Sequence, residues 1–127
     1  MIKVAMTESD MERHKMVTYS ATIPHLFLEE IFDVTDVIPI VEASLARKQP
    51  ISLLSIIIKA FSMAISAHPR INTIYKMNNQ FNFSLASQQN VLVPIYGKPG
   101  LGYSLLSGLE KHSILGIQNI LDSNDQG

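Results

Sequence analysis

The sequence contains no cysteine. This absence excludes disulfide bonds and thiolate metal sites, and it leaves the redox environment of the chain undetermined. An excess of charge is also missing, because 10 basic and 11 acidic residues give a formal net charge of −1. No block of five or more like charges occurs, so the chain lacks the basic surface of nucleic-acid binders and membrane-surface helices. We therefore expect no nucleic-acid partner.

Long apolar runs and clustered metal ligands are scarce as well. The longest apolar stretch, residues 51–67, is interrupted by serines and Lys59. It is shorter than the roughly 20 residues of a membrane span, so we expect no transmembrane segment. Residues 1–13 have neither the apolar core of a secretory signal nor the arginine-rich look of a transit peptide. The four histidines lack the four-residue spacing that puts two ligands on one helical face, and no metal site is expected.

The sequence does contain enough apolar material for a core. Its 127 residues, 46% of them hydrophobic, correspond to one domain or part of one. The apolar spacing predicts helices at residues 37–47 and 51–67, with a short helix over 13–19. Thr35 or Asp36 is the expected cap of the first of these helices, and Ser52 that of the second.

Strand patterns occupy much of the remaining chain. A strand is expected at residues 23–34, and three shorter strands at 71–77, 81–86 and 91–96. Residues 97–102 are rich in Gly and Pro and are expected to form a loop, followed by an amphipathic helix over 103–121. This order of elements predicts an α/β or α+β layered sandwich, with helices packed on a mixed sheet.

Five runs in this order resemble one known family. They are RHKMV from Arg13, IPHLFLEEIFDVTDV from Ile23, ISLLSIIIKAFSMAISAHPRIN from Ile51, the hairpin that ends in VLVP at Pro94, and the stretch at 103–121. Together they are similar to the catalytic domain of the dihydrolipoyl acyltransferases of 2-oxoacid dehydrogenase complexes. The resemblance implies a chloramphenicol-acetyltransferase-like fold, of which this chain would be roughly the N-terminal half.

The departures from the family pattern are specific. Family members carry Asp-Thr-x-x-Gly before the VLVP-like run, and here those positions hold Ala86, Ser87 and Asn90. The carboxylate is therefore absent, and Asn90 stands where glycine is free to take a positive φ. The family's His-x-x-x-Asp-Gly motif does not occur in these 127 residues. In the family, that motif and the hydroxyl that stabilises the oxyanion belong to the C-terminal half of the domain.

The resemblance implies acyl transfer between dihydrolipoamide and coenzyme A. A histidine deprotonates the thiol and a placed donor stabilises the oxyanion, and in relatives these groups meet at a trimer interface. Two hypotheses follow. The chain is an acyltransferase component that is inactive alone, or it is a non-catalytic assembly subunit of a larger complex. The near-complete register of the motifs favours the first hypothesis, whereas the changes at Ala86 and Asn90 favour the second.

The resemblance assigns no catalytic residue and no metal ligand to this chain. Arg13 is a candidate for binding a coenzyme A phosphate, with a surface or helix-packing role as the alternative. His25 is a candidate for lining a substrate channel, with a strand histidine bonded to neighbouring backbone as the alternative. Lys59 is expected to reach the surface or to pair with Glu29 or Glu30, and contact with substrate or another subunit is its alternative. Coenzyme A and lipoamide are implied by the family alone.

Partner chains follow from the partial fold. Half of a layered sandwich leaves an unpaired sheet edge and an apolar face, which need a covering partner. We expect a homo-oligomer, a complementing acyltransferase chain or a larger complex. Residues 1–127 would form a single partial domain, with an N-terminal extension at 1–20 and a polar tail at 122–127. The location would be the mitochondrial matrix in a eukaryotic source and the cytoplasm in a bacterial one.

Overall fold

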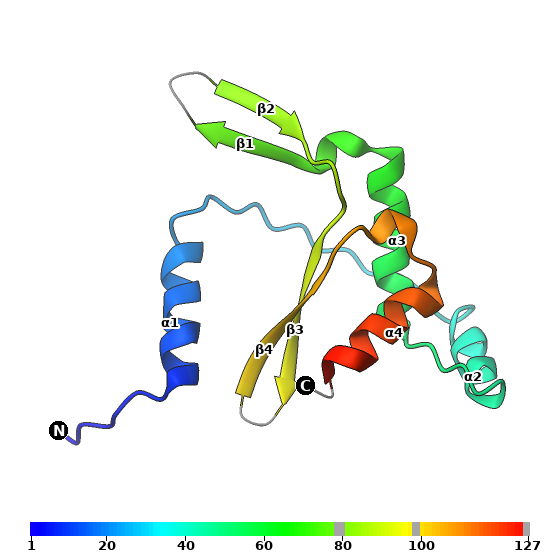
Figure 1. Cartoon of the computed structure of the whole chain (residues 1–127), viewed down its shortest axis with the longest axis horizontal. Helices are drawn as coiled ribbons and strands as arrows, with labels where there is room; N and C mark the ends of the chain where they lie inside the picture. Colours follow the sequence, from blue (N-terminus) through cyan, green and yellow to red (C-terminus); the bar gives the residue numbers. More distant parts are fainter. Residues whose placement is uncertain (78–80, 98–99, 126–127) are drawn as a thin grey trace. The chain divides into compact units, whose positions relative to one another are not determined.

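The computed structural model describes residues 1–77, 81–97 and 100–125 (Figure 1). By their contacts the residues form two compact units, one of Met1–Phe32 with Pro94–Tyr103 and one of Asp33–Val93 with Ser104–Gly127. Among the helices described, none combines the length and apolarity needed to cross a membrane. In chain order the elements are α1 (Glu8–Ser20), α2 (Ile38–Ala46), α3 (Leu53–Ala67), the 3-10 turn η1 (Pro69–Ile71), β1 (Thr73–Met77), β2 (Phe81–Leu85), β3 (Val91–Gly97), β4 (Gly100–Leu106), the 3-10 turn η2 (Leu109–Lys111) and α4 (Ile114–Asp125).

Helix α1 in the first unit begins at a capping box. The Thr7 hydroxyl accepts a hydrogen bond from the Asp10 backbone at 3.1 Å, and the Asp10 carboxylate accepts one from the Thr7 backbone at 3.0 Å. The bond from the Thr7 backbone to this carboxylate, with a second from the Thr7 hydroxyl at 2.8 Å, holds the pKa of Asp10 below its ordinary value. The sequence predicts only the second half of this helix, over 13–19. The capping box accounts for the earlier start, because it satisfies amides that would otherwise be unpaired.

Residues 24–33, which follow α1, have no regular secondary structure. The predicted strand at 23–34 is therefore wrong for the chain as described. A strand exists only through its ladder of hydrogen bonds to a neighbour. The backbone of residues 24–33 makes no hydrogen bond with any other described residue.

The second unit opens with α2. Its N-cap is Val37, which provides no side-chain hydrogen bond, so the predicted cap at Thr35 or Asp36 is wrong. The Thr35 backbone and hydroxyl bond instead to the Asp33 carboxylate, at 2.9 and 2.5 Å. Pro39 lies in the first turn, where a missing amide costs no hydrogen bond. Lys48 follows the helix with φ 58°, in the left-handed region that commonly ends helices.

Helix α3 is confirmed with its predicted cap. The Ser52 hydroxyl accepts from the Ser55 backbone at 3.2 Å, and the helix ends at Ala67, with His68 as its C-cap directly before Pro69. Helix α3 packs against α4 (Figure 1). These helices share a buried apolar core with the start of β3, the end of β4 and η2. The core residues are Ile58, Val93, Leu106, Leu109, Ile117 and Leu121.

Two hairpins complete the fold. Strands β1 and β2 pair antiparallel, with Thr73 opposite Leu85, and β3 pairs with β4 in a second two-stranded sheet. The strands predicted at 71–77, 81–86 and 91–96 are confirmed with small shifts in their bounds. Helices packed on small antiparallel sheets also confirm the predicted layered α/β class.

The end of the chain differs from the prediction. The stretch predicted as a loop at 97–102 and a helix at 103–121 contains β4, η2 and α4. Ser104 and Leu106 are buried while Tyr103 and Leu105 are exposed, which is the two-residue period of a strand. Gly108, at φ 64°, then separates this strand from the helical turns that follow.

Candidate functional site

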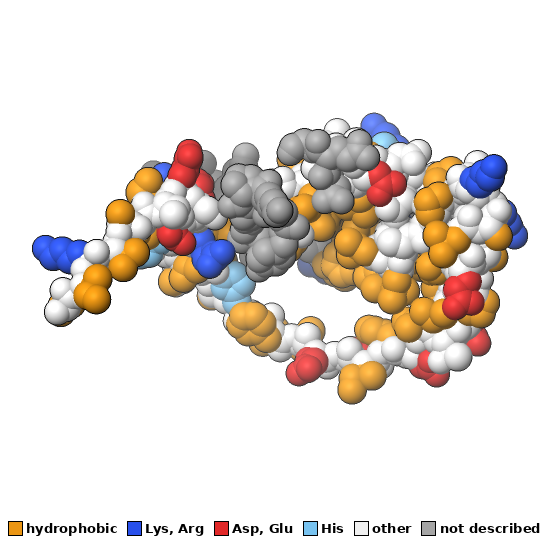
Figure 2. Space-filling model, turned by 90° about the horizontal axis from the view of Figure 1, so that it is seen from below, with side chains coloured by type: hydrophobic (Ala, Val, Ile, Leu, Met, Phe, Trp, Pro, Cys, Tyr) orange, Lys and Arg blue, Asp and Glu red, His pale blue; other side chains and the backbone are white. Residues whose placement is uncertain are grey.

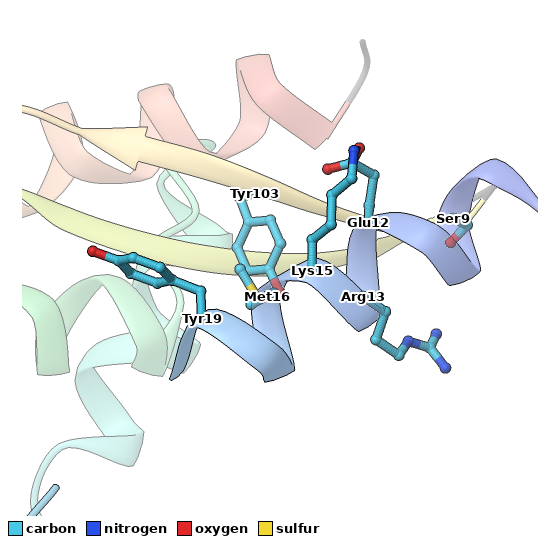
Figure 3. Close-up of a pocket in the computed structure, with 7 residues that line it drawn as sticks. All are labelled: Ser9, Glu12, Arg13, Lys15, Met16, Tyr19 and Tyr103. Carbon is cyan, nitrogen blue, oxygen red and sulfur yellow. The ribbon is translucent and has the colours of Figure 1, made fainter. Parts of the chain in front are cut away.

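The first unit contains a cavity of about 400 Å³ beside α1 (Figure 3). Helix α1 contributes most of its lining, and Tyr103 of β4 contributes the rest. The Tyr103 hydroxyl donates a hydrogen bond to the sulfur of Met16. The residues that line the cavity are Ser9, Glu12, Arg13, Lys15, Met16, Tyr19 and Tyr103.

Arg13 is the sequence candidate that lies at this cavity. Lys15 forms an ion pair with Glu12 at 3.5 Å, and both of these side chains are largely exposed. The Arg13 side chain points away from that pair (Figure 3). Arg13 makes no ion pair with any residue that the structure describes. Its planar group of donors is therefore available to an anionic ligand such as a phosphate.

His25 does not line the cavity. It lies in the exposed segment 24–33, where its ring stacks on that of Phe27 with centroids 6.1 Å apart. Within the described part of the chain, its ring does not make the backbone hydrogen bonds of the alternative interpretation. A role in a substrate channel stays a prediction.

The turn that departs from the family pattern is built around Gln89. Its side-chain oxygen accepts a hydrogen bond from the Ser62 hydroxyl, and its amide donates to Ser66 at 2.8 Å. The backbone of Gln89 donates to the Glu110 carboxylate at 3.1 Å and accepts from Leu109 at 3.0 Å. Gln89 is buried, with 8% of its surface exposed, so these bonds compensate for the loss of water. The turn is thereby fastened to α3 on one side and to η2 on the other.

Asn90 replaces the family's glycine without taking its backbone conformation. Lys48 is the only non-glycine residue with positive φ in the described part of the chain, so Asn90 does not adopt the left-handed region. Its side-chain oxygen instead accepts a hydrogen bond from the Gly108 backbone at 3.2 Å. Gly108 takes the left-handed conformation, at φ 64°. The change at Asn90 therefore has a structural use in this chain.

Lys59 and Glu110 also lie in the second unit, where each makes hydrogen bonds to the backbone. The Lys59 amine donates to the backbone carbonyl of His112 at 2.7 Å. Its pairing with Glu29 or Glu30 stays a prediction. Hydrogen bonds from its own backbone and from that of Gln89 hold the pKa of Glu110 below its ordinary value. No group of three or more potential metal ligands lies together among the residues described.

Solved structures identify the fold. Dihydrolipoamide acetyltransferase from Azotobacter vinelandii, in a study of the role of a serine, a histidine and an asparagine in its catalytic mechanism, matches with TM-score 0.86 and 17% identity. That match covers 99% of this chain and 54% of the other. A probable dihydrolipoamide acetyltransferase from Listeria monocytogenes matches with TM-score 0.81 and 16% identity, covering 98% and 55% of the two chains.

A truncated catalytic core of the 2-oxoacid dehydrogenase complex from Thermoplasma acidophilum matches with TM-score 0.77 and 18% identity, over 97% of this chain and 57% of the other. At these low identities the matches show the fold alone, and they confirm the predicted acyltransferase fold. The chain spans a little over half the length of these structures. A search of curated proteins found no match.

The family itself is shown by the sequence. The family described as 2-oxoacid dehydrogenases acyltransferase (catalytic domain) matches residues 2–125. Because this match covers nearly the whole chain, the protein belongs to that family.

Proposed function

We propose that this chain forms the N-terminal part of an acyltransferase catalytic domain that moves an acyl group between a dihydrolipoyl thiol and coenzyme A. The family match over residues 2–125 carries this proposal. The cavity beside α1 supports it, because Arg13 offers donors there that suit a phosphate of coenzyme A.

The chemistry requires groups beyond those in this chain. The dihydrolipoyl thiol must lose its proton to a base, and the tetrahedral oxyanion needs a placed donor. The family's His-x-x-x-Asp-Gly motif is absent from the 127 residues. We infer that a segment outside these residues supplies the base, on the same polypeptide or another. Because removing a general base lowers rates by about 10²–10⁴, residues 1–127 alone should show little transfer.

The assembly is part of the same proposal. One similar solved structure is the cubic core of a pyruvate dehydrogenase multienzyme complex, with TM-score 0.85 and 17% identity over 99% of this chain and 54% of the other. We infer that this chain also works in an oligomeric core with other acyltransferase polypeptides. Its location would be the mitochondrial matrix in a eukaryote and the cytoplasm in a bacterium.

The experiment is isolation of the tagged chain from its source under native conditions. The assembly is analysed for native mass, for the identity of its polypeptides and for acetyl transfer from acetyl coenzyme A to dihydrolipoamide. We expect a large core that transfers acetyl groups and contains a His-x-x-x-Asp-Gly segment. The control is the 127-residue chain expressed alone, which should transfer acetyl groups about 10²–10⁴ times more slowly. Stoichiometric isolation with a complex that has neither that segment nor transfer activity would overturn the proposal.

A further inference from the structure

Met16 places a sulfur atom at the cavity beside α1. This sulfur accepts the hydrogen bond from the Tyr103 hydroxyl, and both side chains line the cavity (Figure 3). Within the part of the chain that the structure describes, this is the hydrogen bond that joins α1 to another element. Figure 2 shows hydrophobic side chains at the surface along the N-terminal part of the chain, and α1 buries no residue. The contact between Met16 and Tyr103 is therefore a polar link between α1 and β4 at the cavity.

The Met16 sulfur is accessible to small oxidants. The sequence has six methionines and no cysteine, so methionine thioethers are the oxidisable sulfur groups of these 127 residues. Met16 is 39% exposed and borders a cavity of about 400 Å³. Hydrogen peroxide is small enough to reach such a position while the helix stays folded. Exposure favours oxidation, so Met16 is a site at which a peroxide can act.

Oxidation changes the atom that Tyr103 contacts. A lone pair of the Met16 sulfur attacks one oxygen of hydrogen peroxide, so that an S–O bond forms and the O–O bond breaks. The second oxygen leaves with its own proton, takes the proton of the first, and becomes water. The sulfur is thereby oxidised by two electrons to the sulfoxide, and the peroxide is reduced. The new oxygen occupies space beside the sulfur where the Tyr103 hydroxyl lies, so the hydroxyl has to move.

Arg13 lies close enough in the sequence to respond to this change. It precedes Met16 by three residues, a spacing that puts two side chains on one side of a helix, and both residues line the cavity. A sulfoxide oxygen carries partial negative charge and accepts hydrogen bonds without donating any. It therefore competes with a phosphate for the guanidinium donors of Arg13, and it also repels the phosphate.

We propose that Met16 is a regulatory oxidation site. A peroxide converts its thioether to the sulfoxide, which displaces the Tyr103 hydroxyl and weakens the binding of a coenzyme A phosphate at Arg13. The effect on coenzyme A rests on the proposed function, whereas the oxidation itself does not. Enzymes that reduce methionine sulfoxide would restore the thioether and the original affinity.

Peptide mapping by mass spectrometry tests the modification. The native assembly is treated briefly with dilute hydrogen peroxide and then with a mixture of methionine sulfoxide reductases A and B, which together reduce both epimers of the sulfoxide. We expect Met16 to gain one oxygen in the first step and to lose it in the second. The exposed residues Met11 and Met63 are the internal references. If Met16 stays unmodified under conditions that oxidise both references, the proposal is overturned.

The KM for coenzyme A, measured before and after oxidation, tests the consequence. We expect oxidation to raise it by about 3–10-fold, the effect of one disturbed hydrogen bond, and the reductases to reverse the rise. Met16→Leu should abolish this response, because leucine is apolar and has no sulfur. Met11→Leu is the matched control, since Met11 is on the same helix, is 48% exposed and does not line the cavity. A response that persists in Met16→Leu, or that disappears in Met11→Leu, would overturn the proposal.

Met16→Gln measures the effect without an oxidant. Its side-chain oxygen imitates that of the sulfoxide, so the KM for coenzyme A should exceed that of Met16→Leu by about the same factor as oxidation produces in the wild type. Equal values in these two variants would refute the competition with Arg13.

Acetyl transfer separates this inference from the proposed function. An assembly that transfers acetyl groups, with a KM for coenzyme A that does not respond to oxidation of Met16, refutes the inference and leaves the proposed function intact. An assembly without transfer refutes the proposed function, and titration calorimetry with coenzyme A then decides the inference. Weaker binding after oxidation would support it, and unchanged or undetectable binding would overturn it.

Discussion

The side-chain oxygen of Gln118 accepts two hydrogen bonds from Ser52, at 2.8 Å from its backbone nitrogen and 2.7 Å from its hydroxyl. The same Ser52 hydroxyl accepts from the Ser55 backbone as the cap of α3. The Gln118 amide in turn donates to Asp122 at 2.8 Å, one turn further along α4. The first turn of α3 is thereby joined to α4 through one residue pair separated by 66 positions. The contact adds a polar link to the apolar core that α3 and α4 share.

Gln118→Ala should destabilise the chain by about 1–3 kcal/mol, because it leaves two partly buried donors of Ser52 without an acceptor. The measurement is urea unfolding followed by circular dichroism. Gln88→Ala removes the same side chain at an exposed position and should change stability by less than about 0.5 kcal/mol. Equal losses in the two variants would contradict the role given to Gln118.

Gln89 and Ser62 should be energetically coupled. Gln89→Ala removes a buried carboxamide and leaves the Ser62 and Ser66 hydroxyls without their partner, at a cost of about 1–3 kcal/mol. Ser62→Ala in the Gln89→Ala background should cost less than it does in the wild-type chain. A double-mutant cycle should therefore give a coupling of about 0.5–3 kcal/mol. Strict additivity would show that the bond between them contributes nothing.

Adjacent leucines in β4 provide a matched test of the core. Leu106 is fully buried, whereas Leu105 is 60% exposed. Leu106→Ala should destabilise the chain by about 2–5 kcal/mol, because it removes buried surface and leaves a cavity. Leu105→Ala should cost much less. If instead the residues continued the predicted helix at 103–121, both leucines would lie on its apolar side and the two losses would be similar.

Glu110 predicts a dependence of stability on pH. Its folded pKa lies below its ordinary value of 4.5 because its own backbone and that of Gln89 bond to the ionised carboxylate. The folded chain therefore takes up the proton less readily than the unfolded one. The stability that Glu110 contributes is fully present above pH 4.5 and is lost as the pH falls through the folded pKa.

The measurement for Glu110 is urea unfolding between pH 7 and pH 3. Glu110→Gln should be less stable than wild type at pH 7, and the difference should shrink below pH 4.5. Glu42→Gln removes a carboxylate of the same type at an exposed position of α2, and it should remain parallel to wild type. A Glu110 difference that stays constant across this range would contradict the prediction.

The parts of the fold that depend on local signals were predictable from the sequence. Ser52 caps α3 and Pro69 limits its end, so both bounds follow from nearby residues. The strands of the first hairpin and β3 follow from short apolar runs between turn residues. Residues 103–121 were mispredicted because the apolar residues of β4 continue in phase into those of α4. The left-handed backbone of Gly108 and the 3-10 turn η2 divide them.

Nonlocal contacts account for what the sequence could not show. Residues 24–33 have the local properties of a strand, but a strand also needs neighbours, and none pairs with it within the described chain. Arg13 was named through the family resemblance, whereas Tyr103 joins the same cavity from a position 90 residues away. No local signal marks Gln89, because its partners Ser62 and Ser66 come from α3, far back in the chain.

The assignment of Arg13 leads to a kinetic prediction for the native assembly. If its guanidinium binds a phosphate of coenzyme A, Arg13→Ala should raise the KM for coenzyme A by about 10–100-fold, as expected from the loss of a charged hydrogen bond. The KM for dihydrolipoamide and kcat should change little, because the lost contact is remote from the reacting thiol. Arg13→Lys should recover only part of the affinity, since a single ammonium lacks the paired donors of arginine.

Lys3→Ala is the matched control for Arg13→Ala, because it removes a positive charge from the exposed stretch before α1. Its KM for coenzyme A should equal that of the wild type. Steady-state kinetics at a fixed ionic strength separate a specific contact from a general loss of positive charge. Equal effects of Lys3→Ala and Arg13→Ala would assign Arg13 to the surface, and an unchanged KM in both variants would place the phosphate site elsewhere.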